Sequence, residues 1–279
     1  METKARAASF AALVADWHRS GDEPELDRLC LAIARAFDPQ VRIERYLKTL
    51  DDIAARAAAR CSDPSEPYAL VGALLHTLFQ DLCFLGNDVA YYDPRNSLLS
   101  AVLDRRLGIP ITLSVVAMEV GRRLGLKLEG VGLPGHFLVR FPDASSRLYV
   151  DVLRSGAIID AYGCVALMDR LHRGRLTWRE EFLEPVSRRS IVKRILLNLK
   201  NSLSQAKDYV AALAAIDMQL AVDPDDPTEL RDRGIIYARL RRYDCAIDDL
   251  ETYLRRSPNA GDGAHIRSTV QYLRQARDL

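Results

Sequence analysis

Apolar residues in the first ninety positions recur every three or four residues, the spacing that places them on one face of an α-helix. The pattern is clearest in two segments, with apolar positions at Phe10, Leu13, Val14 and Trp17, and at Leu26, Leu29, Ile33 and Phe37. Residues 41–60 and 68–85 continue the pattern. The sequence therefore predicts a helical N-terminal region over residues 1–90.

A different kind of helix is predicted from Ile111 to Gly125, with Pro110 in its first turn. Apolar residues cover most of the surface of this helix instead of a single stripe, so we expect it to be deeply buried. A shorter helix comes before it, and Asn96 or Ser97 is the predicted N-cap of that shorter helix.

Three short runs with the character of β-strands follow, with the sequences LKLEGVGL, HFLVRF and RLYVDVL. Polar residues at 142–146 connect the second run to the third, which predicts a hairpin. Helices that surround a small antiparallel sheet make the predicted fold class α+β.

From Ser190 onward the chain is helical again, and it repeats with a period of 34 residues, the length of a tetratricopeptide repeat. Pairs at this offset are Tyr209 with Tyr243, Ala212 with Ala246, Leu220 with Leu254, and Pro224 with Pro258. The second unit, residues 227–256, fits the repeat pattern well, because Gly234 occupies its small-residue position. The first unit, residues 193–222, is degenerate, because Lys200 stands at that glycine position. A last helix over residues 264–277 would cap the stack.

These patterns predict three domains. Residues 1–90 form a helical region packed on the core, residues 91–187 form the α+β core, and residues 190–279 form an α-helical tail of repeats. The length of 279 residues is sufficient for more than one hydrophobic core.

Composition narrows the possible functions. The net charge is +1, from 39 basic and 38 acidic residues, which argues against a nucleic-acid binder with a basic face. Pairs of arginines are interpreted as solvated helix faces: Arg105-Arg106, Arg122-Arg123, Arg188-Arg189, Arg241-Arg242 and Arg255-Arg256. No run of about 18 apolar residues predicts a membrane span. The N-terminus does not resemble a signal peptide.

Cysteine usage indicates a reducing compartment. The five cysteines are odd in number and scattered, at Cys30, Cys61, Cys83, Cys164 and Cys245, and no CxxC pair occurs. This spacing argues against a disulfide framework and against a structural zinc site, and the cytoplasm is the expected location. The histidines show no metal-ligand spacing, and no glycine-rich phosphate-binding motif occurs, so we predict neither a metal nor another cofactor.

The strongest candidate chemistry is a histidine and an aspartate on neighbouring strands. His136 follows the turn Pro134-Gly135 at the mouth of one strand, and Asp151 stands in the next. In a catalytic triad the aspartate orients the imidazole, which activates a nucleophile. The order of helix, histidine strand and aspartate strand resembles the papain and transglutaminase architecture, in which a cysteine begins the central helix. In the transglutaminase pattern this cysteine stands about fifteen residues before the glycine of a Leu-Gly-Ile turn, which Leu124-Gly125-Leu126 resembles. Pro110 therefore stands at the position of the cysteine.

Other groups could replace the missing thiol. Ser114 and Thr112 lie near the start of the central helix, and a serine with His136 and Asp151 as partners could act as a nucleophile. The favoured interpretation is that both hydroxyls bond free backbone groups in the first turn. Cys83 is the cysteine nearest in sequence to the start of the central helix, and its apolar neighbours predict a buried, inert thiol.

Three segments carry a family resemblance: Asn96-Ser97, GIPITLS from Gly108, and PGHF from Pro134. Together with the repeats, they make the chain from about residue 30 onward resemble bacterial transglutaminase-like proteins of the Sir B one family, named after a proposed invasion-gene regulator. The resemblance implies a transglutaminase-like fold without the catalytic cysteine. One departure is that the family often continues its aspartate as Asp-Pro-Phe, whereas this chain has Asp151-Val152-Leu153.

Two main hypotheses for function follow. In the first, a non-catalytic transglutaminase-like domain and a short repeat tail act by binding another protein, with a regulatory role implied by the family. In the second, the chain is a hydrolase or acyl transferase on peptide or amide substrates, using His136 and Asp151 with Ser114 or an activated water. A weaker third hypothesis is a purely structural or scaffolding protein with no single partner. For the repeat tail two interpretations stay open: a concave groove exposed to a peptide or helix, or a stack that serves mainly as a structural lid for the first domain.

Overall fold

The computed structural model describes residues 2–141 and 147–278, and it confirms the α+β class. The chain forms two compact units. The first, called the core unit, is Pro24–Ile195; the second, called the repeat unit, combines Met1–Glu23 with Leu196–Leu279. Helix α1 (Glu2–Ser20) therefore belongs with the repeats and packs on α9. The predicted domain boundaries at residues 90 and 190 stay a prediction.

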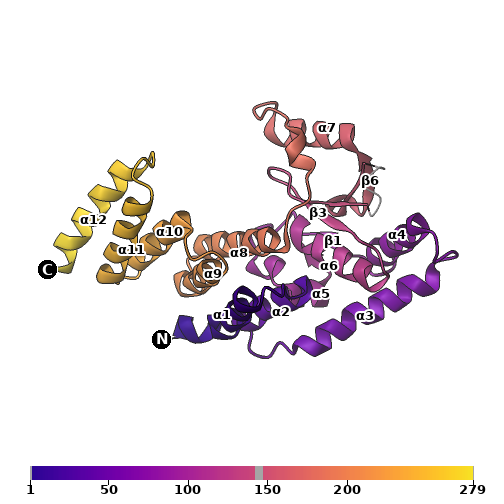
Figure 1. Cartoon of the computed structure of the whole chain (residues 1–279), viewed down its shortest axis with the longest axis horizontal. Coiled ribbons are helices and arrows are strands. Elements are labelled where there is room, and N and C mark those ends of the chain that lie inside the picture. The colour runs from indigo at the N-terminus through magenta and orange to yellow at the C-terminus, as the bar shows by residue number, and fades with distance from the viewer. Residues whose placement is uncertain (1, 142–146, 279) are drawn as a thin grey trace. The chain divides into compact units, whose positions relative to one another are not determined.

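The helices of the core unit other than α7 surround one buried central helix, α6 (Pro110–Arg123), in which every residue from Pro110 to Gly121 is buried, as its composition predicts. Helices α2, α3 and α5 pack on α6, and strands β3 and β4 also contact it (Figure 1). The other helices are α2 (Leu26–Phe37), α3 (Ile43–Arg60), α4 (Pro67–His76), α5 (Leu99–Arg105) and α7 (Ala161–His172).

A four-stranded antiparallel sheet has the order β3-β4-β5-β6. Its strands are β3 (Glu129–Val131), β4 (Leu138–Arg140), β5 (Leu148–Asp151) and β6 (Ala157–Asp160). The first three fall within the predicted runs, and the predicted connection at 142–146 lies outside the described residues. Strand β6 was not predicted, because it is a largely exposed edge strand without a buried apolar face. A short parallel pair joins β1 (Leu85–Gly86) to β2 (Leu107–Gly108).

Buried charges hold α6 to α2. The carboxylate of Asp27, only 1% exposed, accepts a hydrogen bond from Arg123 Nη2 at 2.8 Å and from Arg122 Nη2 at 3.2 Å. Glu119 Oε2 accepts from Arg122 Nε at 2.9 Å. Arg123 also donates to Asp51 of α3 at 2.6 Å. The interpretation as a solvated helix face is therefore wrong for Arg123, whose side chain is only 13% exposed and contacts carboxylates of α2 and α3, whereas Arg122 keeps a solvent-exposed side.

This cluster makes the stability of the core unit depend on pH. Burial, and next the Asp27 carboxylate, raise the pKa of Glu119 to about 7 from an ordinary value of 4.5. Between those two pH values the folded state holds a proton that the unfolded state has released, so stability falls as the pH rises through 7. From pH 6 to pH 8 we expect the wild type to lose about 1 kcal/mol of unfolding free energy. The Glu119→Gln variant removes this loss.

Urea unfolding can measure this effect in the core unit alone. The chain has two tryptophans, with Trp17 in the repeat unit and Trp178 in the core unit. In a Trp17→Phe background the fluorescence of Trp178 reports the core unit at each pH. The same slope with pH in wild type and Glu119→Gln would contradict the assignment to Glu119.

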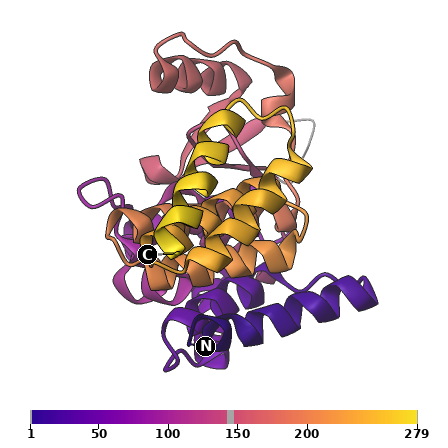
Figure 2. The same ribbon diagram turned by 90° about the vertical axis from the view of Figure 1, so that its left-hand side faces the viewer.

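The repeat unit consists of antiparallel helix pairs, as the 34-residue period predicts. The helices after α1 are α8 (Arg188–Gln205), which belongs to this unit from Leu196 onward, α9 (Tyr209–Val222), α10 (Pro227–Arg239), α11 (Tyr243–Arg256) and α12 (Gly263–Arg277). Helices α10 to α12, orange to yellow in Figure 2, lie side by side. Gly234 allows α10 to approach α11, because a Cβ there would lie 2.7 Å from Leu250 Cγ. No helix in the described residues is long and apolar enough to cross a membrane.

Lys200 replaces the small residue of the first repeat by a buried ion pair. Its ammonium group donates to Glu229 Oε1 at 2.8 Å and to Asp232 Oδ2 at 2.7 Å. Lys200 and Glu229 are only 3% and 4% exposed. The degenerate position thus joins α8 to α10 by charge, whereas Gly234 joins α10 to α11 by close packing.

Candidate functional sites

The sheet brings His136 and Asp151 together, as predicted. Val139 of β4 pairs with Val150 of β5, so the start of β4 lies beside the end of β5. His136 Nε2 lies 2.9 Å from Asp151 Oδ1, and the two residues are 4% and 1% exposed. With the aspartate ionised, the imidazole donates this hydrogen bond, and its other nitrogen becomes the acceptor. The pair therefore has the geometry of an oriented base.

Further contacts fix the position of the Asp151 carboxylate. Asp151 Oδ1 accepts a hydrogen bond from the backbone N–H of Leu153 at 3.2 Å, which starts a short 3₁₀ turn. Arg154 Nε lies 3.7 Å from Asp151 Oδ2. The replacement of the family's Asp-Pro-Phe by Asp151-Val152-Leu153 therefore leaves the aspartate ordered and buried.

The turn before His136 is held from two sides. Gly135 has a φ of +73°, a conformation that favours glycine. Arg194 Nη2 donates to the carbonyl of His136 at 2.6 Å and to that of Leu133 at 3.1 Å. His172 Nε2 lies 2.9 Å from the carbonyl of Pro134. Arg194 and His172 are positioning residues that sequence reasoning missed, because they lie 58 and 36 residues after His136 and belong to no local motif.

Asn96 organises the loop that precedes the central helix, and it is not an N-cap. Helix α5 begins after Leu98, which has no side-chain capping bond. Asn96 Nδ2 instead donates to the carbonyl of Ala90 at 2.8 Å and to that of Tyr91 at 3.2 Å. Its Oδ1 accepts from Asn87 Nδ2 at 3.0 Å. The predicted N-cap at Asn96 or Ser97 is wrong, since Leu98 holds the cap position, Ser97 ends a 3₁₀ turn, and the buried Asn96 amide closes the loop over residues 87–96.

The first turn of α6 is bonded within the protein. Thr112 Oγ1 accepts from the backbone N–H of Ile109 at 3.1 Å and donates to the carbonyl of Asn96 at 2.7 Å. This matches the favoured interpretation of Thr112. Pro110, at the expected cysteine position, is buried and offers no nucleophile.

Ser114 differs from Thr112. It is fully buried, and its hydroxyl has no hydrogen-bond partner among residues 2–141 and 147–278. The expectation that it bonds a backbone group is therefore wrong. The structure likewise gives it no hydrogen bond to His136, so the geometry offers no support for Ser114 as the nucleophile.

The cysteines do not supply a replacement thiol. Cys83 is exposed, with a φ of +55° and its Sγ 3.3 Å from the carbonyl of Gln80, so the prediction of a buried thiol is wrong. Burial raises the pKa of the Cys164 thiol to about 12, which keeps it protonated near neutral pH. In the part of the chain that the structure describes, no group of three or more histidine, cysteine, aspartate or glutamate side chains is placed so that it could hold a metal ion.

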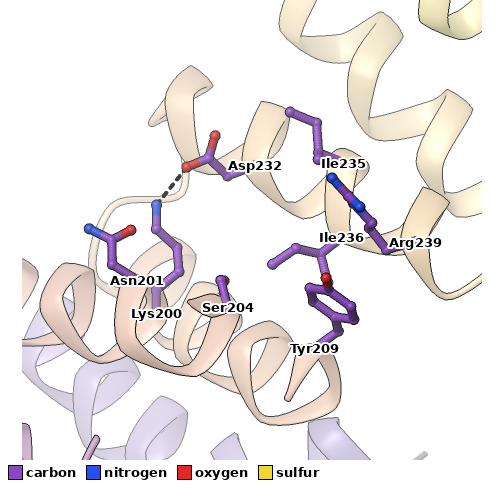
Figure 3. A pocket seen from close by; sticks show the side chains of 8 residues that line it. All are labelled: Lys200, Asn201, Ser204, Tyr209, Asp232, Ile235, Ile236 and Arg239. Carbon is purple, nitrogen blue, oxygen red and sulfur yellow. Dashed lines mark hydrogen bonds and ion pairs between the residues drawn. The ribbon is translucent and has the colours of Figure 1, made fainter. Parts of the chain in front are cut away.

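A second candidate site lies in the repeat unit. Helices α8 and α10 and the start of α9 line a hollow of about 240 Å³. Figure 3 shows Lys200, Asn201 and Ser204 from α8 on one side, and Ile235, Ile236 and Arg239 from α10 on the other. Sequence reasoning predicted a groove in the repeats but named none of these residues as lining it. The 34-residue period could have identified these residues, since the lining residues of α8 and α10 lie on corresponding faces of the first helix in each repeat.

Comparisons with known proteins agree with this architecture. The chain matches the transglutaminase-like superfamily over residues 44–197, and it matches the tetratricopeptide repeat over residues 199–271. No solved structure matches the chain.

Curated relatives extend the match along the chain. A UPF0162 protein of Vibrio cholerae is 31% identical over 254 residues, which cover 90% of this chain and 93% of the relative. A UPF0162 protein of Xylella fastidiosa is 37% identical over 74% of this chain and 75% of the relative. Protein SirB1 of Salmonella typhimurium is 26% identical over 63% of this chain and 65% of the relative. With a superfamily match over more than half of its length and relatives aligned along most of it, the chain belongs to the UPF0162 family of transglutaminase-like proteins with tetratricopeptide repeats.

Proposed function

We propose that this protein acts by binding another protein through the hollow between α8 and α10, and that its His136–Asp151 pair is a non-catalytic remnant. The observation that carries the proposal is the hollow itself, in which the 38%-exposed side chain of Ile235 lies among polar groups. Tetratricopeptide stacks use such concave surfaces for binding. Binding of this kind can regulate the partner, and we place it in the cytoplasm.

The core supports a non-catalytic role. A proline occupies the position where a transglutaminase-like enzyme carries its thiol, and the Ser114 hydroxyl is buried without a bond to the imidazole. Within the described residues, no hydroxyl or thiol is hydrogen-bonded to His136. An oriented base that has no nucleophile within hydrogen-bond distance supports the view that the transglutaminase-like fold serves a structural and not a catalytic purpose here.

The experiment is a selection of random twelve-residue displayed peptides on the full chain. Asn201→Trp fills the hollow, and Gln205→Trp places the same ring on an exposed position of α8 outside it. We expect Asn201→Trp to lose the selected peptides, and Gln205→Trp and His136→Ala to keep them. The absence of peptides enriched by the wild type over Asn201→Trp would overturn the proposal.

A second candidate function is a hydrolase that uses His136 to activate a water. The distance of 2.9 Å between Asp151 Oδ1 and His136 Nε2 favours this second function, because a catalytic base makes the same contact with the carboxylate that orients it. The test is hydrolysis of a chromogenic amide by wild type, His136→Ala and Asp151→Asn. Equal background rates in all three support the binding role, and turnover lost in both variants supports the enzyme.

A further inference from the structure

The groove in the repeat unit continues beyond the first hollow. A second hollow, of about 560 Å³, is lined by α10, the start of α11, and α12. Ile235 and Arg239 line both hollows, so the two meet on α10. The first helices of successive repeats, α8 and α10, and the capping helix α12 thus form one surface. At about 10 Å between packed helices, it extends for about 20 Å, the length of about six extended residues.

The charges along this surface are unequal. Arg239 and Arg241 line the groove, are exposed, and have no ion-pair or hydrogen-bond partner for their side chains in the described residues. His265 adds a third nitrogen-bearing side chain to the second hollow. Asp232 is the carboxylate among the lining residues, and it pairs with Lys200 at 2.7 Å and Arg231 at 2.9 Å, which also contact Glu229 and Asp262 outside the hollows. The groove therefore presents uncompensated positive charge.

Other arginines on α10 show that pairing is the rule on this helix. Arg233 donates to Asp249 at 2.7 Å and to Asp217 at 3.0 Å. Arg231 donates to Asp262 at 3.0 Å. Arg239 is the α10 arginine that faces both hollows, and it lacks such a partner in the described residues.

Apolar side chains lie between the cations. Ile235 is 38% exposed where the hollows meet, and Tyr272 of α12 is 67% exposed in the second hollow. A partner that fills the groove must therefore supply both carboxylates and apolar side chains.

We propose that the groove binds an acidic peptide segment of about six residues, whose apolar side chains lie on Ile235 and Tyr272 and whose carboxylates pair with Arg239 and Arg241. The inference rests on the proposed function and adds the chemistry of the partner. Cations on such a groove select partners of opposite charge and speed their association.

The test uses the same display of random twelve-residue peptides on the full chain. Peptides selected by the wild type are expected to be enriched in aspartate, glutamate and large apolar residues. The double variant Arg239→Glu with Arg241→Glu is expected to bind the best of them at least about tenfold more weakly. The control, Arg242→Glu with Arg255→Glu, makes the same change of net charge at positions that line neither hollow, and it should keep full affinity.

The outcomes separate the two proposals. If no peptide is enriched over Asn201→Trp, the proposed function fails. If peptides are enriched without an excess of acidic residues, or if both double variants weaken binding equally, the function stands and the acidic chemistry fails. A labelled twenty-nucleotide poly-dT strand provides the last arm: tight binding that Arg239→Glu with Arg241→Glu abolishes would replace the peptide by a nucleic acid.

Discussion

Replacing Lys200 by methionine is expected to cost the repeat unit about 3 to 5 kcal/mol of unfolding free energy at pH 8. The substitution keeps the length and apolar stem of the side chain but removes the charge that neutralises Glu229. Burial already raises the pKa of Glu229, even with the ammonium group 2.8 Å away. Without Lys200, the carboxylate must stay charged in a buried site or take up a proton. Urea unfolding followed by Trp17, in a Trp178→Phe background, measures the loss.

The pH dependence and a second substitution show whether the unpaired Glu229 carboxylate causes the stability deficit of Lys200→Met. Protonation of Glu229 relieves the buried charge, so the deficit of Lys200→Met should shrink as the pH falls to 5. Lys200→Met combined with Glu229→Met should recover most of the stability, because it leaves no charge of this pair unpaired. A deficit that is independent of pH would show that methionine merely fits poorly between α8 and α10.

Arg123→Met is expected to destabilise the core unit by about 3 kcal/mol. The Arg123 side chain is only 13% exposed, and Asp27, its main partner, is almost completely buried. Losing this arginine leaves Asp27 with only the longer contact of Arg122, at 3.2 Å, and Glu119, a neighbouring buried carboxyl, with Arg122 alone. Unfolding followed by Trp178 in the Trp17→Phe background is the measurement.

The adjacent arginine is a natural control. The Arg122 side chain is 41% exposed, so Arg122→Met should cost less than Arg123→Met, because solvent screens its contacts. Adding Asp27→Asn to Arg123→Met should restore part of the loss, since the neutral amide does not require a cation. Equal losses for Arg122→Met and Arg123→Met would contradict the importance of burial.

Regular patterns made most of the fold predictable. The 34-residue period and Gly234 gave helices α8 to α12, because each repeat meets its neighbour through the same few positions. The apolar surface of residues 111–125 indicated that α6 is central and buried. Strand β6 was missed because exposed edge strands need no apolar alternation. Local periodicity thus predicts elements that bury a face and fails for those that do not.

The candidate site was predictable only in part. His136 and Asp151 carried a recognisable order along the chain, and the sheet places them in contact. Arg194 and His172, which hold the turn before His136, come from other helices and make contacts that tertiary folding alone creates. The same limit explains the mistaken interpretation of Arg123 as solvated. A charged residue in a sequence is expected to be solvated. Its buried partner cannot be recognised when that partner lies on another helix, far away along the chain.

Proline at the start of the central helix also determines how the protein responds to oxidants. Thiol enzymes lose activity when peroxide or an alkylating reagent modifies the nucleophile, because the reactive thiolate is also the most vulnerable group. Pro110 has no side chain that such reagents attack, so the start of α6 offers them no thiol. Reagents would instead meet Cys83 and Cys245, whose thiols are exposed elsewhere on the chain. The start of α6 thus lacks the group at which thiol enzymes are most readily inactivated.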